Sequence, residues 1–396
     1  MSLPILQLKK NEDKRLREGH VWVYSNEIDT KKSPLQSFKP GAEVLVKAAN
    51  QDPLGVAYIN PHSLIAARLY SNKLTDRLNV ELLSTRLAQA LKLRESLFSK
   101  PYYRLAFAES DALPGVVVDR FGDHLVVQCN TYGMDLKKEE LLLALRAVLP
   151  EMKSLLWRND SPIRLQEGLD TVVTAGWGEP PETVRIEENE TAFQVPLWQG
   201  QKTGWFFDHR LNRARLKDYV HGQRVLDVFS YLGGWGIQAA RLGAKEVLCV
   251  DSSAFACESI RQNAALNHVQ AQVEVYCEDA ITALQKLARE KKKFEVIILD
   301  PPAFIKKRKD QKEGWLAYQR LNILALKLLS PLGILISCSC SMHLLYDDFM
   351  KLLQGASRHA HCQLQVLERG HQGPDHPVHL AIPETDYLKA VILRKL

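Results

Sequence analysis

Two cysteines stand where the pattern predicts the end of a strand, in the segment Ser337-Cys-Ser-Cys-Ser341. A thiolate can add to C6 of a cytosine and make C5 nucleophilic enough to attack a methyl sulfonium, whereas methylation of an amine needs no thiol. The thiolate must be accessible to do so. Because side-chain direction alternates along a strand, we expect only one of Cys338 and Cys340 to face a pocket, and we favour Cys340. The alternative for either cysteine is that of a small buried packing residue.

A carboxylate and two prolines follow another apolar run, in Leu299-Asp-Pro-Pro-Ala-Phe304. The prolines end strand pairing and fix an extended turn. They would present Asp300 at the carboxyl edge of a sheet, where ligands bind in α/β folds. The pattern resembles that of methyltransferases that modify an exocyclic amine or a base carbon. A plain turn after a strand explains the bare tripeptide equally well.

A third set of residues has the pattern of a cofactor site. In Asp227-Val-Phe-Ser-Tyr-Leu-Gly-Gly-Trp-Gly236 we expect Asp227 to end a strand and the glycines to form a tight turn before a helix. The glycine spacing does not fit GxGxxG, which counts against a nicotinamide dehydrogenase. An aspartate at this turn suits the sulfonium and amino groups of S-adenosylmethionine better than a pyrophosphate.

Carboxylates also follow the next two expected strands. Asp251 ends one of them and Asp279 the other, where Asp279 would bind the adenine amino group. A glycine turn alone is more often structural, but three successive strand ends with carboxylates are hard to explain as core. We therefore expect the cofactor to contact Asp227, Phe229, Ser230, Tyr231, Gly233, Gly234, Asp251, Ser252, Asp279, Ala280 and Asp300.

A parallel sheet is needed to bring these strand ends together. The candidate strands are almost wholly apolar, as expected when helices cover both faces of a sheet. They are Arg224–Phe229, Glu246–Val250, Val273–Tyr276, Phe294–Leu299 and Gly333–Ser337. With helical stretches between them, they predict a doubly wound, Rossmann-like α/β domain over residues 186–396.

Two smaller domains are expected before it. Residues 1–73 contain short β-type runs broken by turn residues, which predicts a β-rich domain. Residues 74–185 begin with leucines at helical spacing up to residue 98. They continue as strand, strand, helix, strand, strand, which is a small α+β module. Residues 176–190 are rich in Gly, Pro and Glu and have the composition of a linker.

The composition indicates which kind of partner the protein could bind and in which cellular compartment it folds. The net charge of +6 is compatible with an anionic partner. Because Lys306, Lys307, Arg308 and Lys309 follow Asp-Pro-Pro, we favour RNA contact there over a solvated loop. Seven scattered cysteines predict a reducing cytoplasm, with no disulfide framework and no metal site. No apolar run approaches the roughly 20 residues of a membrane span.

Several stretches together resemble the RlmI-type 5-methylcytosine methyltransferases of large-subunit ribosomal RNA. The catalytic-domain stretches are Gln201-Lys-Thr-Gly-Trp-Phe-Phe-Asp-His-Arg210, Leu226–Gly236, Leu299–Phe304, Ser337–Ser341, Asp375–Val378 and Pro383-Glu-Thr-Asp-Tyr-Leu-Lys389. Gly19–Tyr24 and Pro40–Glu43 resemble the family's PUA domain, and Ser110–Asp119 resembles its central module. The similarity runs nearly from end to end of the chain.

The resemblance implies a β-barrel-like PUA domain that binds RNA, S-adenosylmethionine as cofactor, a cytosine of 23S ribosomal RNA as substrate, and a homodimer. It also implies that Phe206, Asp208 and Arg210 belong to a lip over the cofactor. The family often has Asp-Gln-Arg where this chain has Asp208-His209-Arg210. We assign His209 no catalytic role, because a lone histidine is more often a hydrogen-bonded structural residue.

In the mechanism that we favour, Cys340 attacks C6 of the cytosine and Asp300 hydrogen-bonds the N3/N4 edge of the base. Two other functions stay open. An RNA methyltransferase for an amine of adenine or guanine would use Asp300-Pro-Pro-Ala-Phe304 without a nucleophile. A ribosome-assembly factor with vestigial catalysis would need only to bind RNA, although the acidic strand ends argue against it.

Overall fold

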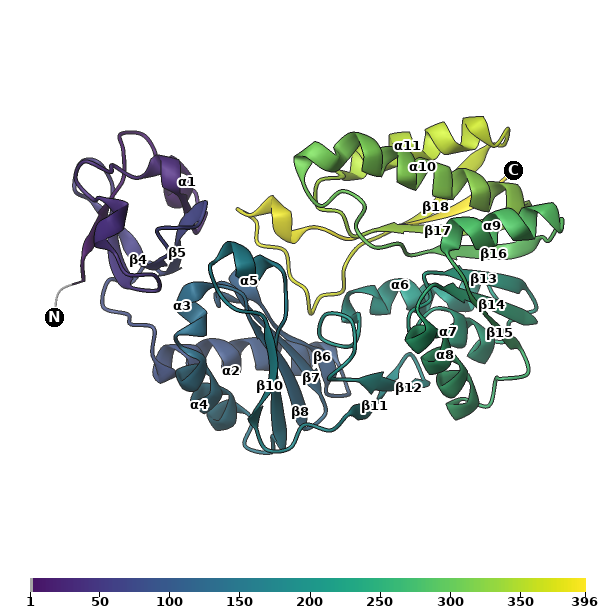
Figure 1. Cartoon of the computed structure of the whole chain (residues 1–396), viewed down its shortest axis with the longest axis horizontal. Coiled ribbons are helices and arrows are strands. Elements are labelled where there is room, and N and C mark those ends of the chain that lie inside the picture. The colour runs from purple at the N-terminus through teal and green to yellow at the C-terminus, as the bar shows by residue number, and fades with distance from the viewer. Residues whose placement is uncertain (1–2) are drawn as a thin grey trace. The chain divides into compact units, whose positions relative to one another are not determined.

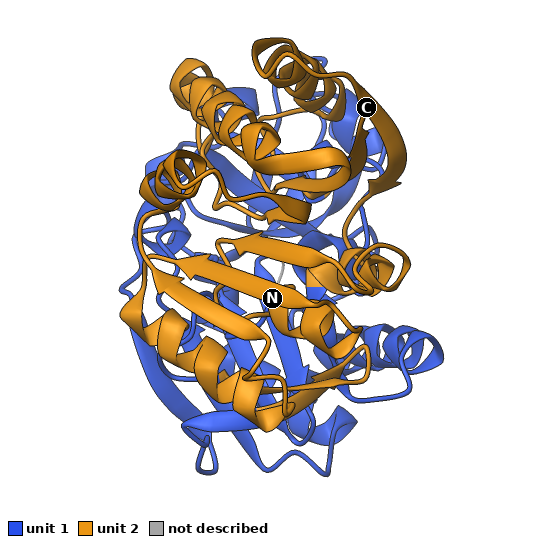
Figure 2. Cartoon of the chain, turned by 90° about the vertical axis from the view of Figure 1, so that its right-hand side faces the viewer, with its two compact units in different colours: residues 1–184, 196–207, 374–385 blue, residues 185–195, 208–373, 386–396 orange. Residues whose placement is uncertain are grey.

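The computed structural model describes residues 3–396 as two compact units (Figure 2). Unit 1 contains residues 3–184, 196–207 and 374–385, and unit 2 contains residues 185–195, 208–373 and 386–396. Each unit is therefore assembled from separate stretches of the chain. Among the described residues, no helix is both long enough and apolar enough to cross a bilayer.

A five-stranded sheet in the order β1-β3-β4-β5-β2 forms the N-terminal part of unit 1. Its strands are β1 (Ile5–Gln7), β2 (Trp22–Tyr24), β3 (Glu43–Lys47), β4 (Pro53–Ile59) and β5 (Ile65–Ser71), with the short helices α1 (Lys14–Arg17), η1 (Ser25–Glu27) and η2 (Leu35–Ser37). Alternate side chains of β3, including Val44 and Val46, enter its core. This confirms the expected β-rich domain, with β1 and β5 as additional strands.

A second five-stranded sheet, in the order β10-β9-β8-β7-β6, forms the central part of unit 1. Its strands are β6 (Tyr102–Phe107), β7 (Val116–Phe121), β8 (His124–Cys129), β9 (Ser154–Asn159) and β10 (Val172–Trp177). The helices are α2 (Val80–Leu97), η3 (Ala108–Asp111), α3 (Tyr132–Asp135), α4 (Lys138–Val148) and α5 (Ile163–Gln166). Strands β7 and β8 pair antiparallel as a hairpin.

Three expectations for this region are wrong. Strand β6 precedes the expected strand-strand-helix-strand-strand series. The first helix begins at Val80 rather than at residue 74, because the Asn79 side chain accepts a hydrogen bond from the Leu82 amide and caps it. The expected linker contains β11 (Thr183–Glu188), which pairs with β12 (Thr191–Pro196).

The sheet of unit 2 has seven strands in the order β15-β14-β13-β16-β17-β19-β18. Five parallel strands confirm the predicted ones within a few residues, and β17 pairs antiparallel with β19, which pairs antiparallel with β18. The strands are β13 (Arg224–Val228), β14 (Glu246–Asp251), β15 (Val273–Cys277), β16 (Phe294–Leu299), β17 (Leu329–Ser339), β18 (Leu364–Gly370) and β19 (Lys389–Lys395). The two C-terminal strands were not predicted.

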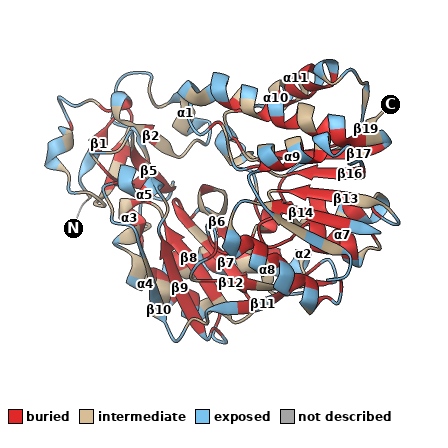
Figure 3. Ribbon diagram, turned by 45° about the vertical axis from the view of Figure 1, so that its right-hand side comes forward, coloured by how far each residue is buried: buried red, intermediate tan, exposed pale blue. Residues whose placement is uncertain are grey.

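Helices cover both faces of this sheet (Figure 1). One group, α9 (Ala280–Arg289), α10 (Gln311–Leu328) and α11 (Tyr346–His359), packs on the face that carries Leu226 and Val228. The other, α7 (Gly236–Arg241) and α8 (Ala254–Leu266), packs against β14 and β15. The remaining short helices are η4 (Phe207–His209), α6 (Arg210–Ala214), η5 (Arg215–Asp218), η6 (Arg308–Asp310) and η7 (Pro383–Thr385). The central strands are buried along their length, as the apolar runs predicted (Figure 3).

Candidate active site

The glycine turn between β13 and α7 is built around the carboxylate of Asp227. Asp227 is the fourth residue of β13 rather than its last, and its Oδ2 accepts a hydrogen bond from the Gly236 amide at 2.9 Å. A Cβ on Gly236 would lie 2.4 Å from Cys249 Sγ. Gly233 has a φ of +82°, a conformation that L residues rarely adopt. The turn therefore needs glycine for its shape and for close packing.

The other oxygen of Asp227 points to a ligand. The side chain is fully buried, and Oδ1 has no hydrogen-bond partner within the described part of the chain. Burial, together with the nearby charges of Asp300 and Asp251, raises the pKa of Asp227 to about 7, although hydrogen bonds with Gly236 and Ser230 act in the opposite direction. A buried carboxylate with an unused oxygen and two acidic neighbours fits a cationic ligand. The sulfonium and ammonium groups of S-adenosylmethionine are of that kind.

Asp251, the last residue of β14, fixes the turn from its other side. Its Oδ2 accepts from the Tyr231 amide and its Oδ1 from the Ser253 amide, both at 2.9 Å. Each carboxylate oxygen has a second lone pair, so Asp251 can still accept hydrogen bonds from ribose hydroxyls. Ser230 is buried and donates to the Asp227 carbonyl at 2.8 Å, which makes it a structural member of the turn.

Asp279 is not at a strand end, because β15 stops at Cys277. It is the N-cap of α9, where its Oδ1 accepts from the Thr282 amide at 3.0 Å. Its side chain is exposed, as is that of Ser252, whereas Ala280 is buried. The expected contact of Asp279 with adenine stays a prediction, beside a capping role that the sequence analysis missed.

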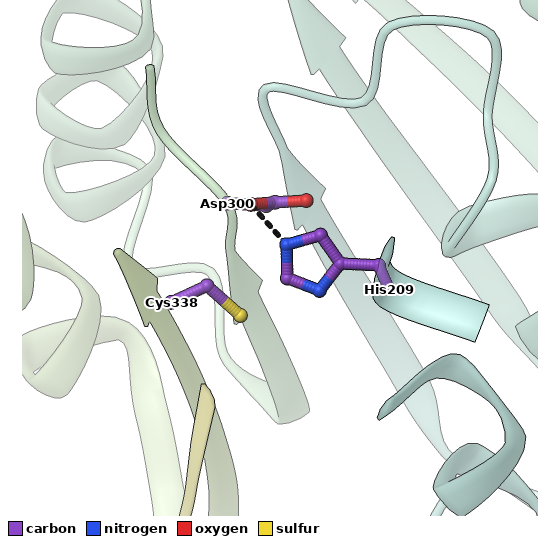
Figure 4. A group of neighbouring side chains, drawn as sticks. All are labelled: His209, Asp300 and Cys338. Carbon is purple, nitrogen blue, oxygen red and sulfur yellow. Dashed lines mark ion pairs between the residues drawn. The ribbon is translucent and has the colours of Figure 1, made fainter. Parts of the chain in front are cut away.

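Asp300 follows β16, and both of its carboxylate oxygens are engaged. Trp235 Nε1 donates to Oδ2 at 3.0 Å, and His209 Nε2 lies 3.1 Å from Oδ1 (Figure 4). Burial would raise the pKa of Asp300, but the charge of His209 and hydrogen bonds from His209 and Trp235 outweigh it and lower the pKa below its usual value. Asp300 is therefore a carboxylate at neutral pH, and His209, to which we assigned no catalytic role, is its direct partner.

The thiol of Cys338 lies beside this pair, with donor atoms of His209, Asp300 and Cys338 all within 4.8 Å of one another (Figure 4). Burial, followed by the charges of Asp300 and Cys340, raises the pKa of Cys338 far above its usual value. A protonated thiol is a poor metal ligand and a poor nucleophile. Since His209 and Asp300 already pair with each other, we assign no metal to this group.

Burial, and not strand alternation, separates the two cysteines. Residues 338 and 340 are two positions apart, and such residues share a face of a strand, so the expected separation by alternation is wrong. Cys338 lies within β17 opposite Ala390 and is fully buried. Cys340 follows the end of β17, is partly exposed, and places its Sγ 3.9 Å from the Pro301 carbonyl oxygen. Accessibility therefore still favours Cys340.

Buried hydroxyls join the Asp-Pro-Pro loop to the end of β17. Tyr318 Oη lies 2.9 Å from Ser341 Oγ and accepts from Ser339 Oγ at 3.0 Å. Ser341 Oγ also accepts from the Ile305 amide at 3.2 Å. The Phe304 ring packs against that of Tyr318, with ring centroids 4.7 Å apart and the ring planes inclined by 55°. These contacts fix Cys340 and Asp300 on neighbouring chain segments at one edge of the sheet.

The three expected lip residues lie in different surroundings. Asp208 is buried and accepts a hydrogen bond from Tyr387 Oη within unit 2. Arg210 Nε lies 3.6 Å from an oxygen of the buried Glu188. Phe206 belongs to unit 1, where Lys202 Nζ lies 4.8 Å from its ring centroid. Their contact with a cofactor stays a prediction.

The basic run after Asp-Pro-Pro lies at the surface. Lys306, Lys307, Arg308 and Lys309 are all exposed, and the last two begin η6. They are available to a polyanion, as the sequence suggested. Three residues that were not predicted at the site contact its members, namely His209, Trp235 and Tyr387, and Lys389 contacts the Ser341 carbonyl beside Cys340. All four stand in stretches that carry the family resemblance, and Trp235 also lies within the glycine turn.

Family models match two parts of the chain. Residues 139–394 match the S-adenosylmethionine-dependent methyltransferase model, and residues 6–72 match that of a PUA-like domain. The first match spans more than half of the chain and contains the glycine turn, Asp300 and Cys340. The class is therefore that of S-adenosylmethionine-dependent methyltransferases with a PUA-like domain, and S-adenosylmethionine is the cofactor.

Two relatives extend along nearly the whole chain. A Tolumonas auensis protein named ribosomal RNA large subunit methyltransferase I is 36% identical, with 98% of each chain covered. The protein of that name from Cronobacter sakazakii is 34% identical, with 97% of each chain covered. The chain belongs to the family of these ribosomal RNA large subunit methyltransferases.

Two solved structures share the fold. A candidate methyltransferase complexed with SAH has a TM-score of 0.86 at 22% identity. The alignment covers 99% of this chain and 100% of that structure's chain. A candidate S-adenosylmethionine-dependent methyltransferase from Streptococcus mutans has a TM-score of 0.84 at 23% identity, with the same coverage. At this identity the likeness concerns the fold alone, and it confirms the predicted fold class.

Proposed function

We propose that this protein methylates C5 of a cytosine in 23S ribosomal RNA through a transient bond between Cys340 Sγ and C6 of the base. The observation that carries the proposal is the partly exposed Cys340 beside the Asp300–Phe304 loop, because transfer to an amine would leave a thiol at this edge without a use. Membership in a family of ribosomal RNA large subunit methyltransferases, at 34–36% identity over nearly the full chain, supports large-subunit ribosomal RNA as the substrate.

The cofactor side of the site supports methyl transfer. S-adenosylmethionine supplies an electrophilic methyl group on a cationic sulfur when it is bound. The unused Oδ1 of Asp227 offers an acceptor for its ammonium group, and Asp251 offers acceptors for ribose hydroxyls. Asp300, ionised and one strand away, adds negative charge on the same side.

The covalent step places specific demands on Cys340. Its sulfur must be a thiolate, so that the S–C6 bond forms with the sulfur electron pair and leaves C5 electron-rich. C5 then forms a bond to the methyl carbon while the methyl–sulfonium bond breaks. A base or water removes the C5 proton, and the S–C6 bond breaks to return the thiolate. Cys340 therefore ends in the state in which it began.

Asp300 serves the base in this mechanism. As a carboxylate it accepts a hydrogen bond from the N4 amino group and favours a proton at N3 while electron density arrives there. Its two oxygens keep lone pairs beyond those used by Trp235 and His209. Lys306–Lys309 would contact phosphates beside the target, and the PUA-like domain would bind RNA further away.

Trapping with a fluorinated base tests the proposal. A 23S ribosomal RNA transcript with 5-fluorocytidine lacks the C5 proton that must leave, so the bond to sulfur should persist. With S-adenosylmethionine present, we expect a protein–RNA adduct on a denaturing gel and a modified Cys340 peptide by mass spectrometry. The adduct should form with Cys338→Ala and not with Cys340→Ala, and a cytidine transcript is the control.

Other outcomes of these experiments would favour one of the alternative functions or the other cysteine. If both cysteine variants keep full turnover and the product is a methylated adenine or guanine amine, the protein is an amine methyltransferase that uses Asp300-Pro-Pro-Ala-Phe304. If Cys338→Ala alone abolishes the adduct, the nucleophile is the other thiol. If calorimetry finds no binding of S-adenosylmethionine, a ribosome-assembly role without catalysis is favoured.

A further inference from the structure

A buried lysine lies on the strand that pairs with β17, opposite the residue that precedes Cys340. Lys389 is the first residue of β19, and its side chain is 6% exposed. In the antiparallel register it stands opposite Ser339, the last residue of β17. Lysine is rarely buried unless its charge has a partner. A cation at this position therefore calls for an explanation.

The ammonium group reaches past the end of β17 to the chain around Cys340. Lys389 Nζ donates to the Ser341 carbonyl and to the Tyr387 carbonyl, each at 2.7 Å. Lys389 thus engages both neighbours of Cys340, Ser339 through strand pairing and Ser341 through its side chain. The charge is placed where the chain turns at Cys340.

Two anionic groups act on this ammonium, the Cys340 thiolate and the Asp386 carboxylate. Burial lowers the pKa of Lys389 to about 8, while the charges of Cys340 and Asp386 act in the opposite direction. Tyr318 and Cys338 also face Cys340, but burial raises the pKa of both, so each stays neutral at pH 7. Asp300 is ionised on the neighbouring loop and opposes ionisation of the thiol, so the thiolate needs the positive charge of Lys389. Two carbonyl dipoles solvate the ammonium only partly, so a thiolate nearby stabilises it.

We propose that Lys389 is a positioning residue for Cys340, which keeps the thiol ionised through its charge and fixes the chain that carries it. A cation beside a cysteine is a known way to make the thiolate available near neutral pH. The effect on the thiol holds whatever the protein methylates. Its consequence for turnover rests on the proposed function.

A second lysine of the same strand supplies a matched control. Lys395 Nζ also donates to two backbone carbonyls, those of Leu326 and Leu329, both at 2.9 Å. Burial lowers its pKa as well, but the thiol that acts on it is Cys362. Lys389→Met and Lys395→Met therefore remove the same kind of contact next to different cysteines.

The test measures alkylation of individual cysteines by iodoacetamide as a function of pH in the full-length protein, with peptide mass spectrometry as readout. In Lys389→Met we expect the pH midpoint of Cys340 alkylation to rise by about one pH unit. Alkylation of Cys340 at pH 7 should therefore be about tenfold slower. Lys389→Arg should restore the wild-type profile. Lys395→Met should leave Cys340 unchanged and shift Cys362 instead.

Two results would overturn the proposal. One is an unchanged Cys340 profile in folded Lys389→Met, which would leave Lys389 a purely structural role. The other result comes from the wild-type protein alone. It is an alkylation profile in which the pH midpoint of Cys340 is equal to or higher than that of Cys362, whose pKa is raised by burial. This second measurement decides the matter if Lys389→Met fails to fold.

The rate of methyl transfer by Lys389→Met distinguishes failure of this inference from failure of the proposed function. If both hold, Lys389→Met should lose about tenfold in methyl transfer at pH 7 and recover at pH 9, where the thiol ionises unaided. If the alkylation profile shifts but methyl transfer does not change, Lys389 tunes the thiol and the nucleophile assignment is wrong. If neither shifts, the inference alone fails, and the fluorocytidine adduct still tests the nucleophile.

Discussion

Asp227 destabilises the folded protein when no cofactor is bound. A neutral residue at this position would make the cofactor-free protein more stable. Asp227 has the Gly236 amide at its Oδ2, but its buried Oδ1 lacks a hydrogen-bond partner within the described structure. With a pKa of about 7 against an ordinary value of 3.8, it keeps its proton in the folded state at a pH where the unfolded chain has lost it. The folded state without cofactor therefore loses stability as pH rises from about 4 to 7.

Asp227→Asn should remove this loss and remove cofactor binding with it. Each pKa unit corresponds to about 1.4 kcal/mol, so at pH 8 the variant should be more stable than the wild type by a few kcal/mol at most, and equally stable below pH 4. Urea unfolding at the two pH values checks the stability. Calorimetry at pH 8 should find that the variant no longer binds S-adenosylmethionine. A variant less stable at pH 8 would contradict the electrostatic account.

His209 sets the charge state of Asp300 through their 3.1 Å contact. Without His209, the pKa of Asp300 should return toward its ordinary value or above it, because burial then acts with less opposition. In His209→Phe, the acid limb of the methyl-transfer profile should move up by about one pH unit. His209→Gln keeps a hydrogen-bond donor and should shift the limb less. Equal profiles for all three proteins would exclude this role for His209.

At the scale of elements, one tyrosine joins α10 to the loop after β16 and to the end of β17. Tyr318→Phe would leave the buried hydroxyls of Ser339 and Ser341 each short of a partner. The expected cost is about 1 to 3 kcal/mol in unfolding free energy, with a lower kcat because Asp300 and Cys340 are less well fixed.

Tyr346→Phe is the matched control for that variant. The Tyr346 hydroxyl is buried without a hydrogen-bond partner in the described structure, so its removal should change stability by less than about 0.5 kcal/mol. Urea unfolding and steady-state kinetics compare the two. If both variants lost the same stability, the hydroxyl network would not be what fixes the loop.

Elements with both faces buried were the ones that sequence predicted well. The apolar runs of β13, β14 and β16 have almost no other way to fold in an α/β domain. Strand β18 was missed because it is an edge strand in which Gln365, Glu368 and Arg369 interrupt the apolar residues, and β19 because an antiparallel return breaks the alternation of strand and helix. Strand β6 was hidden by Arg104, whose charge Asp119 of the neighbouring strand neutralises.

The same contrast holds for the site. Asp227, Asp251 and Asp300 were predictable because they lie at or just after the carboxyl ends of neighbouring parallel strands, which meet at one edge of a sheet. His209 and Lys389 were not, because they come from segments outside the parallel strands and a lone histidine or lysine has no spacing pattern. Only their tertiary contacts, with Asp300 and with the Ser341 carbonyl, show what they do.

At the scale of the whole molecule, the net charge of +6 matters through where it is placed. Lys306 and Lys307 are exposed beside the Asp300 loop, whereas Lys291 and Lys292 are exposed at the far end of α9, just before β16 begins. Both pairs contribute equally to the net charge. If the RNA contacts the protein near Cys340, only the first pair should matter for affinity.

Replacing each pair by glutamine removes two charges and tests this placement. Lys306→Gln/Lys307→Gln should weaken binding of 23S ribosomal RNA fragments that contain the target and reduce the slope of log affinity against log salt by about 1.4, if each lysine neutralises one phosphate of a single strand. Lys291→Gln/Lys292→Gln should leave both quantities unchanged. Filter binding between 50 and 200 mM salt gives the slopes, a range over which phosphate contacts change affinity strongly. Equal slopes for the two double variants would mean that the basic run acts only through net charge, and that the RNA approaches the site from another surface.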